Sequence, residues 1–372
     1  MKKVILIVVG VVLVAVLAWL SLRKDTNSVN QEIVKVGVIL PLTGPYGEEG
    51  QKGLAAMQLA EKEVNASSEY PIKIRLLVED GNFTGKGSLA AYNKLLLKGV
   101  SAFVSFGTPP TQAIKGRIDE AKIPLLAMDG SSGLAKSSKW IFEFFPPLKE
   151  AGLAAGNFSK ESWSSKNKAL FTMNTSGGDD FASGFTLAVG GTVPRETFDA
   201  NSTDVRSQIL KLLKTKPEVI AVFGYSTGYN TAMNQLLESG YKGDIISDAN
   251  ITSIIDKLRK GDRNIYFVSQ SFGDYANNSE SQNFINKLKD DSDVEPTLFS
   301  AYLYEMVKVI AKASNVDGVN PENIQKNILL LKDHPTMFGP MTFSADGDIH
   351  LPFIVLKMGK DGIEVVNSDE NK

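Results

Sequence analysis

One pattern repeats along the chain from Ile33 onward: a short apolar run, a polar loop with glycine or proline, and a helix-like segment. The first run, residues 34–40, has the length and β-branching of a buried parallel strand, and its loop, residues 43–50, opens a helix at about Glu48. This alternation predicts an α/β fold with doubly wound parallel sheets. Ligands bind at the carboxyl ends of such strands, so residues 43–50 are the first candidate for a binding wall.

The alternation occurs in two stretches, which the stiff pair Pro146-Pro147 separates. Before this pair, further strand-like runs lie at 72–78, 102–106 and 124–128, and beyond it at 169–173, 193–198, 219–223, 244–247 and 265–269. Residues 270–274 are expected to cross back between lobes, followed by helices at 282–289, 298–313 and 321–331 and by strands at 341–343, 353–358 and 363–366. The chain therefore predicts two α/β lobes of similar plan.

Composition excludes several classes of function. The 372 residues, 43% of them apolar, are enough for two separate cores. A formal net charge of −2 provides no basic field for nucleic acid. The chain contains no cysteine, which excludes disulfides, thiol chemistry and lipid attachment to a cysteine. His334 and His350 have no metal-site spacing, so neither a metal nor a cofactor is expected.

The N-terminal end predicts export. Two lysines precede an uninterrupted apolar segment, residues 4–22, long enough as a helix to cross roughly 28 Å of hydrocarbon. Residues 1–24 are either a signal peptide or an N-terminal membrane anchor, and residues 25–32 a polar tether. The segment's length and the Arg23-Lys24 pair after it favour an anchor, whereas a weak cleavage site at 16–18 favours a signal peptide. Either alternative predicts a periplasmic or extracytoplasmic protein, in the first case held at the cytoplasmic membrane.

Several segments together resemble one family. The opening VGVILPLTGPYGEEGQKG at 36–53 is similar to that of the type I periplasmic solute-binding proteins, specifically the leucine/isoleucine/valine-binding (branched-chain amino-acid receptor) family. The resemblance runs from about Ile33 to Val366. Further matches, in the family's order and spacing, are KIPLLAMDGSS at 122–132, FDANSTDVRSQILKLLKTKPEVIAVFGY at 198–225, ISDA at 246–249 and MFGPMTFSADGDI at 337–349.

The resemblance implies two lobes, joined by three hinge crossings, that close over a small polar ligand. The N-terminal lobe would comprise residues 33–146 and 274–335, the C-terminal lobe residues 147–273 and 336–366, and the tail residues 367–372. It also implies a non-enzymatic receptor that captures an amino acid or similar solute for an ABC-type importer, with permease subunits as partners. A membrane-anchored sensory ectodomain acting through a partner is the alternative. Enzymatic nucleophile–base and phosphate-binding motifs are missing from the sequence.

Candidate ligand contacts in the N-terminal lobe follow its strands. By resemblance, Thr108, after Gly107, holds the ligand's carboxylate, and Ser131 does so beside the Gly130 backbone. Hydroxyls and free N–H groups at helix N-termini suit an anionic oxygen. As bare sequence, hydroxyls in such positions are more often helix N-caps, and the two roles can coexist.

The C-terminal lobe offers three further candidates. Phe181 stands where many relatives carry a tyrosine, a departure that makes this wall more apolar. Tyr225 matches a pocket aromatic of the family and is expected to contact the ligand, with a tyrosine on the rim as the alternative. Asp248 lies near the family's acidic position and could receive an ammonium group, or could cap the helix after it.

Tyr46 and Glu49 in the opening loop complete the candidates, together with Asp129, where relatives often carry a small neutral residue. The helix dipole alone explains an early glutamate. If Glu49, Asp129 and Asp248 all face the cleft, however, the site is acidic and favours a ligand with at least one amino group. Stabilisation by dicarboxylates and not by amino acids would contradict this hypothesis.

Overall fold

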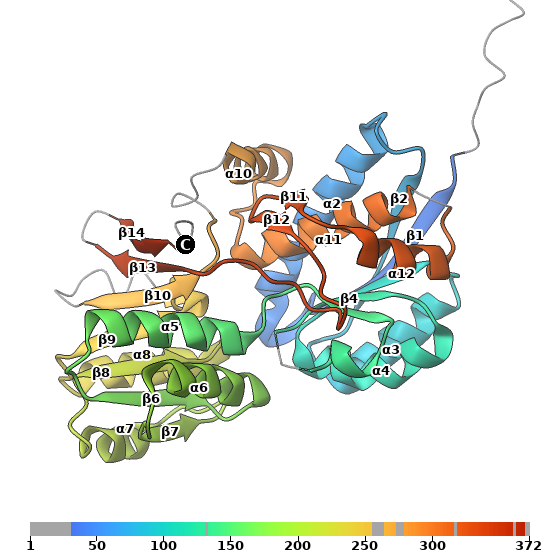
Figure 1. Cartoon of the computed structure of the whole chain (residues 1–372). Coiled ribbons are helices and arrows are strands. Elements are labelled where there is room, and N and C mark those ends of the chain that lie inside the picture. The colour runs from blue at the N-terminus through green and yellow to red at the C-terminus, as the bar shows by residue number, and fades with distance from the viewer. Residues whose placement is uncertain are drawn as a thin grey trace, which may run out of the picture.

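Two lobes, each built on its own sheet, lie side by side in the computed structural model (Figure 1). The structure describes residues 31–130, 133–254, 264–272, 279–315, 318–359 and 362–368. The prediction of two doubly wound α/β lobes is confirmed, and both lobes have the strand order of the flavodoxin type.

The first lobe contains a five-stranded parallel sheet in the order β2-β1-β3-β4-β5. The apolar run of the opening segment forms its second strand and is almost fully buried, as a parallel strand covered on both faces must be. The order reverses between β1 and β3, the switch point beside which ligands bind in such sheets. The strands are β1 (Ile33–Leu40), β2 (Lys73–Asp80), β3 (Ala102–Phe106), β4 (Leu125–Met128) and β5 (Ile141–Glu143).

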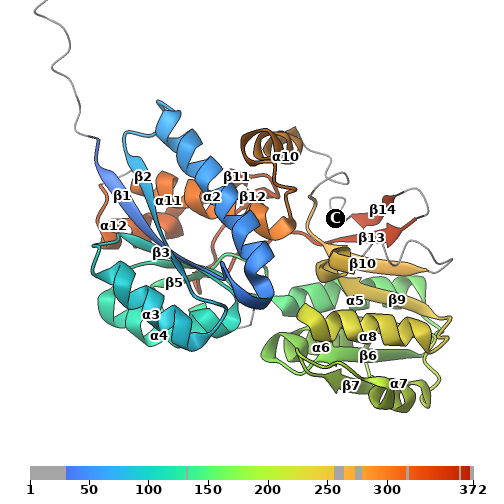
Figure 2. The ribbon, with the colours of Figure 1, turned by 180° about the vertical axis from the view of Figure 1, so that it is seen from behind.

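Helices cover both faces of this sheet (Figures 1 and 2). One face packs against α2 (Gly47–Ala66), α10 (Ser279–Ser292), α11 (Leu298–Ser314) and α12 (Pro321–Leu330), and the other against α3 (Gly85–Leu96) and α4 (Thr108–Ala121). The N-cap Thr297 fixes the start of α11, because its hydroxyl accepts a hydrogen bond from the Ser300 backbone. Short 3-10 turns lie at η1 (Gly44–Tyr46) and η2 (Ala135–Ser137).

The second lobe repeats this plan with two added strands. Its sheet has the order β14-β13-β10-β9-β8-β6-β7, parallel except for β13 and β14. On one face lie α5 (Leu148–Ser162) and α6 (Ser176–Val189), and on the other α7 (Arg206–Leu213) and α8 (Ser226–Glu238) (Figure 2). The remaining elements are β6 (Lys168–Met173), β7 (Arg195–Phe198), β8 (Val219–Phe223), β9 (Asp244–Asp248), η3 (Ala249–Ile254), β10 (Ile265–Ser269), β13 (Ile354–Met358) and β14 (Ile363–Ser368).

Three crossings join the lobes. The first is at Pro146-Pro147, since Phe145 packs on the first core and Leu148 on the second. The second follows β10, and Phe272 already belongs to the first core, while the expected boundary at 274 lies outside the described residues.

The third crossing differs from the expected boundary at residue 336. A hairpin of β11 (His334–Thr336) and β12 (Gly339–Met341), with the chain as far as Leu351, packs on the core of the first lobe. The physical reason is apolar burial, because Met337, Phe338 and Phe343 are at most 5% exposed there. The return to the second lobe comes at about Phe353, which packs on the α5–α6 side.

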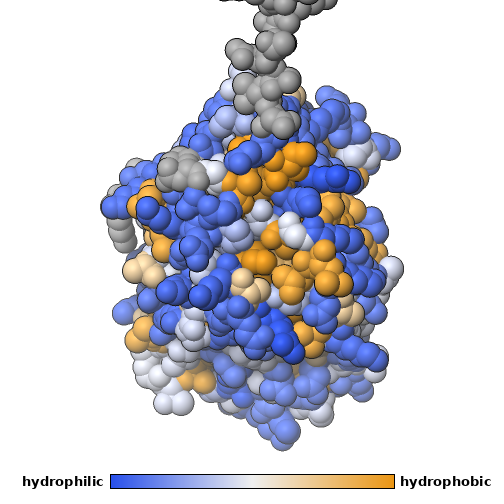
Figure 3. Space-filling model, turned by 90° about the vertical axis from the view of Figure 1, so that its right-hand side faces the viewer, coloured by the Kyte–Doolittle hydropathy of each residue, from blue (hydrophilic) through white to orange (hydrophobic). Residues whose placement is uncertain are grey.

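The predicted signal or anchor segment and most of the tether lie outside the described residues. Within the described ranges, none of the helices has the length and apolar character needed to span a membrane. Figure 3 shows hydrophobic patches between hydrophilic residues on one face of the molecule. Exposed large apolar side chains of the first lobe include Ile33, Leu97 and Leu330. None of these three lines the cavity described next.

Candidate functional site

A cavity of about 410 Å³ lies between the lobes, at the carboxyl ends of strands from both sheets. Side chains of both lobes form its walls. The residues that carry the argument are Tyr46, Glu49, Thr108, Asp129 and Phe299 from the first lobe and Phe223, Tyr225, Asn230, Asp248 and Gln270 from the second lobe or its crossing.

The opening loop forms one lip of the cavity through Tyr46 and Glu49. The Glu49 side chain lies in the first turn of α2, and its Oε2 accepts a hydrogen bond of 3.0 Å from the Thr297 hydroxyl. Burial raises the pKa of Glu49, and this hydrogen bond opposes the rise. Its neighbour Glu48 also borders the cavity, but its side chain is 81% exposed and pairs with Lys52.

Gly107, Thr108, Asp129 and Gly130 follow β3 and β4 and meet in the cavity wall. The Thr108 hydroxyl donates a 2.6 Å hydrogen bond to Asp129 Oδ1. Gly107 has φ +88°, and a Cβ there would lie 2.4 Å from the ring of Phe83, so this position requires glycine. The hydroxyl expected to hold a ligand's carboxylate is therefore engaged by a carboxylate of the protein.

On the opposite wall, Tyr225 precedes α8, and its ring centroid lies 6.3 Å from that of Tyr46 across the cavity. Burial raises the pKa of the Tyr225 hydroxyl, a hydrogen bond with Thr175 opposes the rise, and the charge of Asp129 adds to it. Tyr225 therefore faces the first lobe, and the negative charge of Asp129 on that lobe acts on its hydroxyl.

Asp248 ends β9 and is 6% exposed. Burial raises the pKa of Asp248 to about 7, against hydrogen bonds that include one from the Asn250 side-chain amide. This carboxyl group is thus balanced between its neutral and charged forms near neutral pH, and a cation beside it would favour the charged form.

Eight aromatic rings line the cavity, and only those of Tyr46 and Tyr225 were predicted from the sequence. Phe83, Phe106 and Phe299 are in ring contact, with centroids 6.1 to 6.2 Å apart, and Phe83 lies 4.1 Å from Tyr46. Several of these residues stand at or just beyond strand ends, and that position was the available signal. The lining rings are those of Tyr46, Phe83, Phe106, Phe145, Phe223, Tyr225, Phe299 and Phe353.

Three uncharged polar side chains, those of Asn230, Asn250 and Gln270, also line the cavity and were not predicted. Gln270, on the second crossing, is 2% exposed, and its Nε2 has no hydrogen-bond partner among the described residues. Asn230 Oδ1 on α8 is likewise unpartnered within the described part of the chain. Buried polar atoms of this kind are normally satisfied, and a ligand is one way to satisfy them.

The structure brings most of the predicted site residues together. Tyr46, Glu49, Gly107, Thr108, Asp129, Gly130, Tyr225 and Asp248 all line the cavity. Phe181 does not: it is fully buried behind the wall, where its ring stacks on Phe223 at 5.1 Å. Ser131 lies outside the described residues.

Every charged side chain in the described part of the cavity lining is acidic. Among the described residues, the cavity wall contains four carboxyl groups, from Glu48, Glu49, Asp129 and Asp248, and no lysine, arginine or histidine. Within the same ranges, no group of three potential metal ligands is placed to hold a metal ion. Two lobes on either side of a polar and aromatic cavity, with chain crossings between them, are the architecture of a solute-binding receptor.

Comparison with known proteins gives the family. The family model described as "Periplasmic binding protein" matches residues 33–362, and the chain belongs to this family. It is 24% identical over 350 residues to Leu/Ile/Val-binding protein homolog 1 of Brucella suis, a match that covers 88% of this chain and 92% of the relative. The family consists of receptors and not enzymes, as the sequence analysis predicted.

Solved structures share the fold. The substrate-binding protein LivJ of a branched-chain amino acid transporter from Streptococcus pneumoniae, in complex with isoleucine, superposes with a TM-score of 0.80 at 21% identity, over 90% of this chain and 99% of that chain. A solute-binding protein of an ABC transporter from R. palustris, in complex with benzoate, superposes with a TM-score of 0.78 at 16% identity, over 90% of this chain and 96% of that chain. Both likenesses concern the fold, and their ligands differ from each other in charge.

Proposed function

We propose that this protein is an extracytoplasmic receptor that encloses a small solute with an amino group and presents it to an ABC-type importer. The observation that carries the proposal is that Glu49, Asp129 and Asp248 line one cavity from both lobes. A ligand that touches both walls stabilises the closed arrangement of the lobes relative to the open one, which gives the permease subunits a surface to recognise.

A thermal-shift and calorimetric screen tests the proposal. Solutes with an amino group, amino acids and amines alike, are expected to raise the melting temperature, because a ligand that binds only the folded state stabilises it. Dicarboxylates and benzoate are expected to leave it unchanged. Stabilisation by the carboxylates alone would contradict the proposed function.

The ectodomain of a membrane-anchored sensor is a second candidate, favoured by the long apolar segment at residues 4–22. Retention of that segment in the mature protein would support an anchored form. Mass spectrometry of the N-terminus of the protein isolated from its cells distinguishes the two: a processed end near residue 18 would contradict the anchored form.

A further inference from the structure

The arrangement of Thr108 and Asp129 bears on which amino-group ligands the cavity accepts. Thr108 stands at the start of α4, where a hydroxyl and free backbone N–H groups would suit a ligand's carboxylate. In this chain the Thr108 hydroxyl donates instead to Asp129 Oδ1, 2.6 Å away. Asp129 is 2% exposed and lines the cavity, so its negative charge lies where the carboxylate of a ligand would have to lie.

The described lining residues include carboxyl groups on both walls and no basic side chain. A carboxylate of a ligand, once enclosed, would lose its water, face Asp129 and meet no basic side chain of the described lining. An ammonium group would find carboxyl groups from either lobe within the same cavity.

The uncharged parts of the wall suit the same ligand. Eight aromatic rings line the cavity, and ring faces attract organic cations as well as apolar groups. Gln270, which is 2% exposed and unpartnered at Nε2 among the described residues, offers a neutral donor to an uncharged acceptor such as a hydroxyl oxygen.

From the Asp129–Thr108 pair inside an acidic, aromatic cavity, we infer that the ligand is an alkyl or arylalkyl amine without a carboxylate, and not a zwitterionic amino acid. The inference rests on the proposed function and narrows it. Asp129 takes the place that a ligand's carboxylate would occupy, and the charge of the bound molecule is then a net positive one.

Amines and the amino acids from which they differ by one carboxylate provide the test. Calorimetry at about pH 8 would compare tyramine with tyrosine, phenethylamine with phenylalanine, and isoamylamine with leucine. Each amine is expected to bind at least tenfold more tightly than its amino acid. Equal or tighter binding of the amino acids would overturn the inference and leave the proposed function standing. Binding of benzoate or dicarboxylates alone would overturn both.

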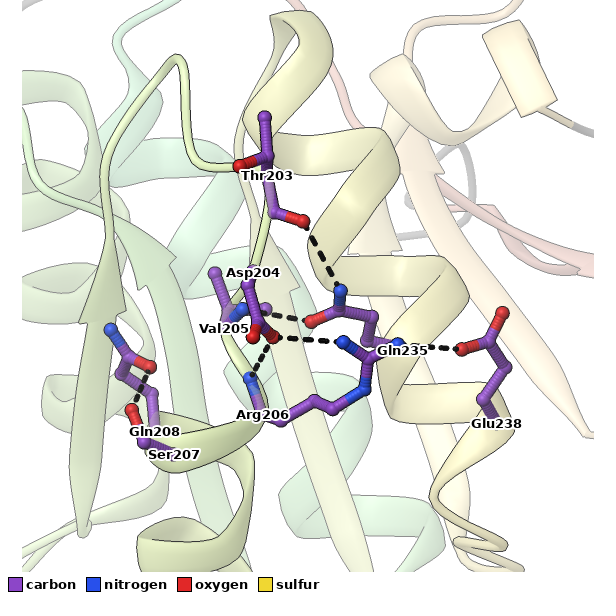
Figure 4. Close-up of polar contacts among 8 residues, drawn as sticks. All are labelled: Thr203, Asp204, Val205, Arg206, Ser207, Gln208, Gln235 and Glu238. Carbon is purple, nitrogen blue, oxygen red and sulfur yellow. Dashed lines mark hydrogen bonds and ion pairs between the residues drawn. The ribbon is translucent and has the colours of Figure 1, made fainter.

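The substitution Asp129→Asn adds a test at the pair itself. The variant keeps the size of the side chain and removes its charge, so the amine is expected to lose at least tenfold in affinity while the amino acid gains. The control Asp204→Asn removes an exposed carboxylate at the start of α7, where it pairs with Arg206 outside the cavity (Figure 4). An unchanged ratio of amine to amino-acid affinity in folded Asp129→Asn would overturn the inference.

Discussion

The two walls of the cavity hold their acids differently. In the first lobe, Glu49 and Asp129 each accept a hydrogen bond from a threonine hydroxyl, Thr297 and Thr108 respectively. In the second lobe, Asp248 is held by Asn250, and burial raises its pKa to about 7. Burial also raises the pKa of Glu49, so a cation that enters the cavity favours the charged form of the acids on both walls, and this effect is greatest at Asp248.

Asp248→Asn is expected to produce the largest effect. Removing one partner of an enclosed charge pair typically costs about 2 to 5 kcal/mol, so amine affinity should fall by roughly 30-fold or more. Calorimetry at about pH 8 measures the change, with Asp204→Asn as the control outside the cavity. A loss of less than about threefold, in a variant that melts cooperatively, would mean that the second wall does not hold the charged group.

The pH dependence of stability examines the same residue without ligand. Folded Asp248 keeps its proton up to about pH 7, whereas the ordinary value is 3.8, so between these values the folded state binds more protons than the unfolded chain. The free energy of unfolding should therefore fall as the pH rises through this window, by on the order of 4 kcal/mol at most. Amine affinity should change in the opposite direction and increase with pH.

Urea unfolding at about pH 5 and pH 8 measures how the free energy of unfolding changes with pH. The same measurement on Asp248→Asn shows how much of that change comes from Asp248. Buried Glu143, close to Asp348, contributes with the same sign, because burial and that neighbouring carboxyl group raise the pKa of Glu143 to about 10. Its contribution is present in both proteins and cancels in the comparison. Equal pH dependence in the two proteins would show that Asp248 titrates normally.

Tyr225→Ala should weaken ligand binding by roughly tenfold to a hundredfold while the fold stays intact. The half-buried ring is an aromatic contact between the walls, and such anchors typically contribute about 1 to 3 kcal/mol. Calorimetry gives the affinity, and circular dichroism checks the fold. Unchanged affinity would remove Tyr225 from the site.

The smallest expected effects on amine affinity come from Glu49 and Glu48, which are neighbours on α2. Glu49→Gln is expected to lower amine affinity by about tenfold, since Glu49 is a largely buried acid of the first wall. Glu48→Gln, the matched control one residue away, should change it by less than threefold, because an exposed ion pair with Lys52 contributes little. Equal effects of the two substitutions would argue that only the overall negative field matters.

The fold and the candidate site were predicted from the sequence on different grounds. Buried parallel strands leave a strong apolar pattern, which predicted the α/β lobes, and their ends mark where ligand contacts gather. Thr108 and Asp248 were candidates by resemblance to the family, and both of them, like Asp129, line the cavity. The side-chain partners could not be predicted, because the bonds from Thr108 to Asp129 and from Thr297 to Glu49 depend on tertiary packing.

Two misplacements have the same origin. Phe181 was placed by sequence position, whereas packing against Phe223 moves it behind the wall. The return crossing was placed at residue 336, but Met337 and Phe338 complete the apolar core of the first lobe and hold the chain there as far as Leu351. A hydrophobic pattern identifies residues that become buried and leaves open which core receives them.

A structure of the protein with a bound amine such as tyramine tests the central claim most directly. The account predicts a closed cavity in which the ammonium nitrogen lies within about 3.2 Å of carboxylate oxygens, with Asp248 on one side and Glu49 or Asp129 on the other. An amine bound outside the cavity, or one whose nitrogen contacts none of these three carboxylates, would contradict it.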